Sequence, residues 1–134
     1  MGDPGPPSGP AGTLGEKLGI ELLEVTAERV VGRMPVEGNT QPFGQLHGGA
    51  TAVLAETLAS VGGFTASGGQ LTLGIEIKVN HLRSVTSGWI TGTAVPLHVG
   101  RTTQVWEMRI RDDEGRLTAF STCTLAIRPL PPAG

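Results

Sequence analysis

The chain has 134 residues, with ten basic and twelve acidic side chains and a formal net charge of −2. This length suits one domain with its own core, and the near balance of charge argues against a nucleic-acid partner. Cys123 is the only cysteine, so neither an intrachain disulfide nor a cysteine-rich metal site can form. No apolar run reaches the roughly 18 residues that a membrane span needs. Without a signal-peptide pattern either, we expect a soluble, cytoplasmic protein.

The composition divides the chain into three parts. Residues 1–11 are rich in Pro and Gly and are expected to form a disordered tail. Residues 12–128 contain the periodic segments and form the predicted folded domain, and residues 129–134 are expected to be a flexible C-terminus.

A single long helix is predicted over residues 48–64, because apolar side chains recur there every three or four positions. Its high alanine content favours close packing on nearly all sides, as in a central helix. Elsewhere strand patterns dominate; Trp106 and Ile110, for example, alternate with charged residues. A turn at 112–115 joins the last two strands. In chain order, the predicted elements are a short helix at 13–18, strands at 20–26 and 29–35, the long helix, and strands at 71–82, 89–97, 103–111 and 116–127.

The segment 41–49, Gln-Pro-Phe-Gly-Gln-Leu-His-Gly-Gly, is typical of a loop that turns into a helix, and Glu56 follows seven residues later. A helix N-terminus has free N–H groups and a partial positive charge, which favour anions and developing oxyanions. A carboxylate directed into the same space supplies a base or a nucleophile. The two parts together indicate attack on an activated acyl group.

Five motifs follow one another along the chain, at residues 40–60, 80–84, 96–101, 104–106 and 114–117. In this order they resemble the motifs of the hot-dog acyl-CoA thioesterases. Three groups are nearest: the Arthrobacter-type 4-hydroxybenzoyl-CoA thioesterases, the phenylacetate-pathway thioesterases, and, most similar, the dihydroxynaphthoyl-CoA thioesterases of menaquinone synthesis. The resemblance covers about residues 18–128 and implies an α+β hot-dog fold, an antiparallel sheet wrapped around one long central helix.

The resemblance also implies catalytic roles. Glu56 would attack the thioester carbonyl or activate a water that does so, and the sequence is compatible with both routes. The backbone N–H of Gly48 would bind the thioester oxygen, and Gln41 would orient the thioester or the water. Ser60 lies one helical turn after Glu56, where it would hydrogen-bond the carboxylate or the water. His47 would either cap the helix or approach the substrate carbonyl.

Substrate-binding residues are implied in the same way. His81 would lie near the acyl pocket, while Arg83, Arg101, Thr102 and Arg128 would contact coenzyme A, whose phosphates require basic side chains or free N–H groups. Coenzyme A is part of the substrate, so we expect no separate cofactor, and the histidine spacings fit no metal site. Considered without the resemblance, each of these residues also has a purely structural explanation, such as an exposed glutamate or a solvated arginine.

An open sheet edge and a bare helix flank would be aggregation hazards for a lone chain. Members of the family pair two sheets into a dimer and two dimers into a tetramer. The resemblance therefore implies a homotetramer with active sites between subunits, in which Gln41, His47 and Gly48 of one chain face Glu56 of its partner.

The expected activity is hydrolysis of an acyl-CoA, with an aromatic acyl group favoured, to the free acid and coenzyme A. A hot-dog hydratase or dehydratase is one alternative, but those enzymes begin the helix with Pro-Gly where this chain has His-Gly-Gly. A non-catalytic acyl-CoA sensor is the other, although a sensor would not need the full set of Gln41, Gly48, Glu56 and Ser60.

Overall fold

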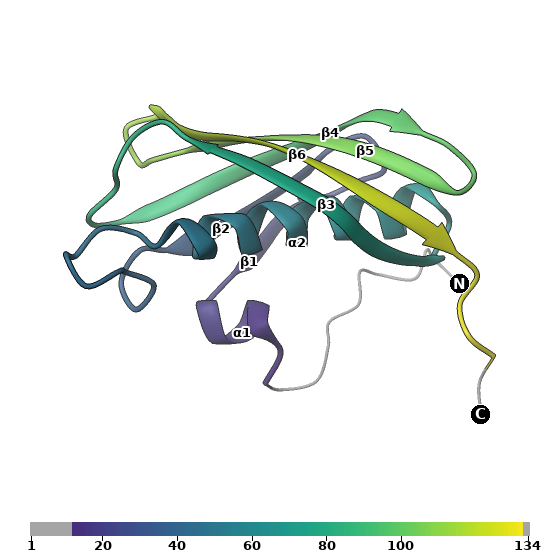
Figure 1. Cartoon of the computed structure of the whole chain (residues 1–134), viewed down its shortest axis with the longest axis horizontal. Coiled ribbons are helices and arrows are strands. Elements are labelled where there is room, and N and C mark those ends of the chain that lie inside the picture. Colours follow the sequence, from purple (N-terminus) through teal and green to yellow (C-terminus); the bar gives the residue numbers. More distant parts are fainter. Residues whose placement is uncertain (1–11, 133–134) are drawn as a thin grey trace.

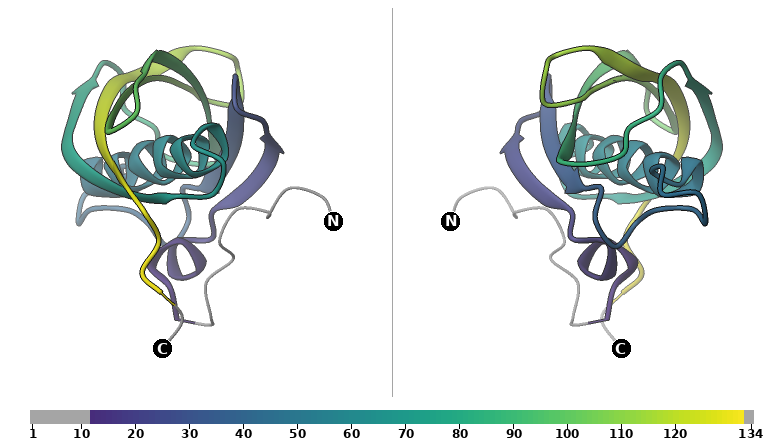
Figure 2. Two further views of the ribbon diagram at one scale, coloured as in Figure 1. Left: turned by 90° about the vertical axis from the view of Figure 1, so that its right-hand side faces the viewer. Right: turned by 90° about the vertical axis from the view of Figure 1, so that its left-hand side faces the viewer.

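The computed structural model describes residues 12–132 and shows an antiparallel sheet curled around one long helix (Figures 1 and 2). This arrangement is the expected α+β hot-dog fold. The predicted tail at 1–11 lies outside the described residues. The elements are α1 (Leu14–Leu18), β1 (Glu21–Val25), β2 (Val30–Pro35), α2 (Gly48–Ala66), β3 (Leu71–His81), β4 (Trp89–Val99), β5 (Thr103–Arg111) and β6 (Leu117–Arg128).

The order of the six strands in the sheet is β1-β2-β4-β5-β6-β3. Strand β3 comes directly after α2 in the chain, yet it pairs with the last strand, β6, and lies at one edge of the sheet. Its register shifts between Gly74 and Glu76, which marks a bulge at Ile75, a residue that is 64% exposed. Within residues 12–132, the outer edge of β3 has no paired strand.

Glycines allow α2 to lie very close to the sheet. Gly32 on β2 and Gly92 on β4 are direct partners in the register, and a Cβ atom on either would lie 2.7 Å from a methyl group of Leu58. On the helix side, a Cβ on Gly62 would lie 2.5 Å from the buried ring of Trp106. A mid-helix glycine costs about 1 kcal/mol in propensity relative to alanine; here it makes room for the largest side chain of the core.

The prediction that α2 is packed on nearly all sides is correct for one face only. Leu54, Ala55, Leu58 and Ala59 are fully buried beneath the sheet. The opposite face, which includes Glu56, stays partly open in the single chain. Small side chains such as Ala55 and Ala59 lie where the helix meets the sheet. A high alanine content therefore does not show that protein also covers the other face of the helix.

The short helix α1 lies on the side of α2 that faces away from the sheet (Figure 1). Thr13 caps its first turn, and Gly19 ends it in the left-handed conformation with φ 77°. The buried Asn39 side chain donates a 2.8 Å hydrogen bond to the carbonyl of Leu18 and another to that of Pro35. Hydrogen bonds therefore fix α1 in place, although none of its residues is buried.

Among the described residues, no helix has both the length and the apolar character that a bilayer span requires.

The Cys123 thiol is buried on β6, on the face that meets α2. Burial, together with the nearby carboxylates of Glu56 and Glu76, raises the pKa of this thiol to about 12. Because the folded-state pKa lies above that of a free thiol, ionisation increasingly favours the unfolded chain as the pH rises above about 9.

We expect the native protein to react with iodoacetamide at about pH 8 roughly a thousandfold more slowly than the urea-unfolded chain, because only the thiolate is reactive. Mass spectrometry of the labelled protein over time measures both rates. Equal rates for the native and unfolded chains would show that the Cys123 thiol is not buried and that its pKa is not raised.

Candidate active site

Helix α2 begins at a cap built from the His47 side chain. His47 has extended backbone angles, φ −69° and ψ 129°, and its Nδ1 atom accepts a 2.8 Å hydrogen bond from the N–H of Gly49. Of the two roles considered for His47, the structure shows the cap. A role toward the substrate carbonyl stays a prediction, and it would have to use the remaining ring nitrogen.

The N–H of Gly48 finds no hydrogen-bond acceptor among residues 12–132. It belongs to the first residue of a 19-residue helix, where the partial positive charge of the helix dipole is concentrated. The imidazole of His81 packs against this glycine: a Cβ at position 48 would lie 3.0 Å from His81 Nε2. A side chain at this position would therefore displace His81.

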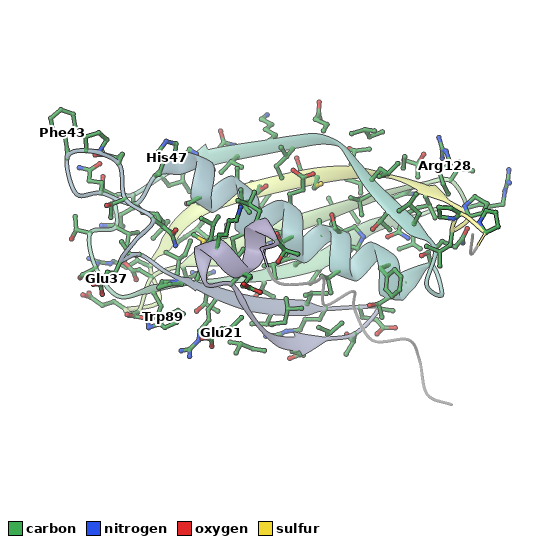
Figure 3. The ribbon with its side chains drawn as sticks, turned by 90° about the horizontal axis from the view of Figure 1, so that it is seen from below. Glu21, Glu37, Phe43, His47, Trp89 and Arg128 are labelled. Carbon is green, nitrogen blue, oxygen red and sulfur yellow. The ribbon has the colours of Figure 1, made fainter. Side chains whose placement is uncertain are left out.

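A cavity of about 410 Å³ opens at this end of the helix, and four of the predicted site residues line it: Gln41, Gly48, His81 and Arg83. Gln41 belongs to a tight loop in which its N–H donates to the carbonyl of Gln45 at 2.7 Å. The Gln41 side-chain oxygen accepts a hydrogen bond from the N–H of Phe43 at the exposed tip of the loop (Figure 3). The loop thus holds Gln41 beside the helix start.

Glu56 and Ser60 line a different cavity, of about 460 Å³, on the open face of α2. Leu14, Val53 and Val61 give this cavity apolar walls. Neither the Glu56 carboxylate nor the Ser60 hydroxyl has a hydrogen-bond partner in the described part of the chain, so the predicted bond between them is not formed here. The backbone carbonyl of Ser60 accepts a 3.1 Å hydrogen bond from the hydroxyl of Thr72 on β3.

Apart from His47, the predicted catalytic residues of one chain thus lie in two separate cavities, Gln41 and Gly48 in one and Glu56 and Ser60 in the other. Gly48 and Glu56 are eight positions apart on one unbroken helix, which corresponds to roughly 12 Å along its axis at 1.5 Å per residue. The described chain alone therefore does not bring the Glu56 carboxylate to the N–H of Gly48.

The predicted coenzyme A contacts also fall into two groups. Arg83 lies in the Gly48 cavity. Arg128 lies at the far end of the molecule from His47 (Figure 3), and its guanidinium donates to the carbonyls of Ile127 and Thr102. Arg101, next to Thr102 in the same turn, is exposed. One chain therefore presents basic side chains at both ends of α2.

Two site features had no counterpart in the sequence prediction. Leu14, from the short helix α1, lines the Glu56 cavity, and Gly74 on β3 lies directly against the Glu56 carboxylate. A glycine inside a strand pattern is a known indication of a close approach, whereas nothing in the local sequence connects Leu14 to the long helix.

Comparison with known proteins gives one consistent answer. Residues 43–119 match the model of the thioesterase superfamily. The proofreading thioesterase EntH of Cronobacter turicensis is 46% identical over 118 residues, covering 87% of this chain and 86% of that protein. The 1,4-dihydroxy-2-naphthoyl-CoA hydrolase of Escherichia coli is 46% identical over 114 residues, covering 84% and 79%.

Among solved structures, thioesterase HI1161 of Haemophilus influenzae superposes with a TM-score of 0.86 at 37% identity, covering 92% of this chain and 89% of that one. Fold, family model and relatives agree, and the chain belongs to the thioesterase superfamily as a thioester hydrolase of the hot-dog fold.

Proposed function

We propose that the protein hydrolyses an acyl-CoA thioester at a site formed by Gly48 of one chain and Glu56 of another. The observation on which this proposal rests concerns the N–H of Gly48: the residue lines a cavity, and its N–H has no hydrogen-bond acceptor among residues 12–132. A thioester oxygen in that cavity would complete the hydrogen bonding of the helix start and become polarised by the helix dipole.

The chemistry needs a group that delivers an oxygen nucleophile to the polarised carbonyl. Glu56 acts either by taking a proton from a water that attacks the carbonyl carbon, or by attacking that carbon itself. In both routes the oxygen of the tetrahedral intermediate takes up negative charge and accepts from the N–H of Gly48. The C–S bond then breaks, and coenzyme A leaves as a thiolate, a good leaving group. In the second route, water finally hydrolyses the mixed anhydride at Glu56.

A second chain is needed because α2 holds Gly48 and Glu56 of one chain apart. The unpaired outer edge of β3 and the open flank of α2 are available for pairing with another copy. Such pairing would bring the Gln41–Gly48 cavity of one chain to the Glu56–Ser60 cavity of its neighbour. We propose a dimer of this kind, assembled further into a tetramer.

The acyl group is proposed to occupy the cavity next to Glu56. Its volume of about 460 Å³ lies within the range of roughly 300–1,000 Å³ typical of small-molecule sites. The apolar walls from Leu14, Val53 and Val61 suit an aromatic acyl group such as the naphthoyl group in the name of the E. coli relative. The coenzyme A phosphates would be held by Arg83 or by the group of Arg101, Thr102 and Arg128.

Replacing Glu56 by alanine removes the nucleophile or base. We expect Glu56→Ala to lower kcat by several orders of magnitude and to leave the affinity for coenzyme A within about threefold of the wild-type value. Thiol release from benzoyl-CoA and naphthoyl-CoA measures turnover, and the buried Cys123 should give little background. Glu28→Ala, which removes an exposed carboxylate in a turn, is the matched control. Turnover by Glu56→Ala within tenfold of the wild type would contradict the assignment.

Leu14 provides a test of where the acyl group binds. It lines the Glu56 cavity and also a neighbouring cavity of about 300 Å³, which His47 and Gly49 line as well. Leu14→Ala should join the two spaces, so that long acyl chains gain apolar contact. We expect the kcat/KM of dodecanoyl-CoA relative to benzoyl-CoA to rise at least about fivefold, the effect of one or two additional buried methylene groups.

Leu23→Ala is the control for this experiment, since Leu23 on β1 has the same exposed fraction as Leu14, 55%. An identical substrate ratio for the wild type and Leu14→Ala, or an equal shift in Leu23→Ala, would place the acyl group elsewhere.

A further inference from the structure

Gly74, on edge strand β3, forms the surface against which the Glu56 carboxylate lies. A Cβ atom on Gly74 would overlap Glu56 Oε2 and lie 3.0 Å from Cδ and 3.5 Å from Cγ of the same side chain. Gly74 is not among the glycines with positive φ, so its backbone conformation is open to alanine. What requires glycine at this position is therefore the space taken by the carboxylate.

Little else in the described chain limits where the carboxylate can lie. Glu56 has no ion pair among residues 12–132, and no donor in that part of the chain hydrogen-bonds its carboxylate. A glutamate on the partly open face of a helix can otherwise choose among several rotamers. The close approach to the backbone of Gly74 is thus a contact of the carboxylate that restricts it without a hydrogen bond or an ion pair.

The surface offered by Gly74 is itself fixed. The residue pairs with Leu125 of β6, immediately before the bulge in β3. Two residues earlier, the hydroxyl of Thr72 donates to the carbonyl of Ser60 on α2 and ties the strand to the helix one turn beyond Glu56. Two sets of hydrogen bonds therefore set the distance between the Gly74 backbone and α2: the pairing of β3 with β6, and the bond from Thr72 to Ser60.

We propose that Gly74 is a positioning residue for hydrolysis: its missing side chain leaves room for one oxygen of the Glu56 carboxylate against β3, and this contact holds the carboxylate in the orientation from which it acts. This inference rests on the proposed catalytic role of Glu56 and goes beyond it, because it explains how a carboxylate without a hydrogen-bonding partner in its own chain is held for reaction.

The direct test is Gly74→Ala. The added methyl group should push aside the far end of a flexible side chain and leave the strand intact, so the protein should fold with a Tm close to that of the wild type. A displacement on the order of 1 Å can cost about a hundredfold in rate. We expect kcat to fall about tenfold to a hundredfold, while KM stays within about twofold, because substrate contacts are retained.

Repeating the substitution in a Glu56→Asp background distinguishes an effect on the position of the carboxylate from a general effect of the added methyl group. In Glu56→Asp the carboxylate is one methylene shorter and withdraws from Gly74. Adding Gly74→Ala to Glu56→Asp should then lower kcat by less than about threefold, which is a clear departure from additivity. In parallel, the carboxyl carbon signal of Glu56 in an NMR spectrum should move in Gly74→Ala, while most backbone amide signals stay in place.

Four results would overturn the proposal. They are wild-type kcat and KM in Gly74→Ala, an equal loss of kcat from Gly74→Ala in both backgrounds, a rise in KM with kcat unchanged, and a Gly74→Ala protein that does not fold. Failure of the proposed function looks different, since Glu56→Ala itself would then remain active whatever residue stands at position 74.

Discussion

The rigidity of α2 is the constraint on which the rest of the site depends. The helix runs unbroken from Gly48 to Ala66, so it holds the backbones of Gly48 and Glu56 of one chain roughly 12 Å apart along its axis. Both groups face space that the chain leaves unfilled. In the proposed dimer, the oxyanion donor and the carboxylate that act on one carbonyl therefore come from two copies of the helix.

The way the sheet packs on α2 explains why one helix can contribute both to the core and to the candidate site. Glycines on both elements let α2 approach closely enough for Leu58 and Trp106 to fill the space between them. All of this packing involves one face of the helix. The other face stays partly open and forms the cavity proposed for the acyl group, with Leu14 of α1 in its wall and Gly74 of β3 against the Glu56 carboxylate. A single helix therefore supplies the core on one side and the candidate site on the other.

The sequence predicted the elements of this fold well, because each depends on a local pattern. The long helix starts at the predicted residue and runs two residues beyond the predicted end at 64, and all six strands were expected. The alternation of Trp106 and Ile110 with charged residues correctly placed both side chains in the core. Gly115 closes the predicted turn with φ 80°.

Features that depend on contacts distant in sequence were not predictable from local patterns. The pairing of β3 with β6 is one, and it determines which strand lies against the Glu56 carboxylate. The division of Gly48 and Glu56 between two cavities is another: the family resemblance implied that they act from different subunits, but no local pattern indicates it. Gly74 and Leu14 were not predicted for the same reason: both matter because they lie near Glu56, which is distant from them in the sequence.

Mixing two inactive variants tests the shared site most directly. Glu56→Ala lacks the carboxylate, and Gly48→Val blocks the helix start, where even a Cβ would approach His81 Nε2 to 3.0 Å. When equal amounts are co-expressed, random pairing gives intact sites with a frequency of about one quarter. The proposed arrangement therefore predicts that thiol release from acyl-CoA returns to about a quarter of the wild-type rate. A mixture as inactive as its two components would contradict a site shared between chains.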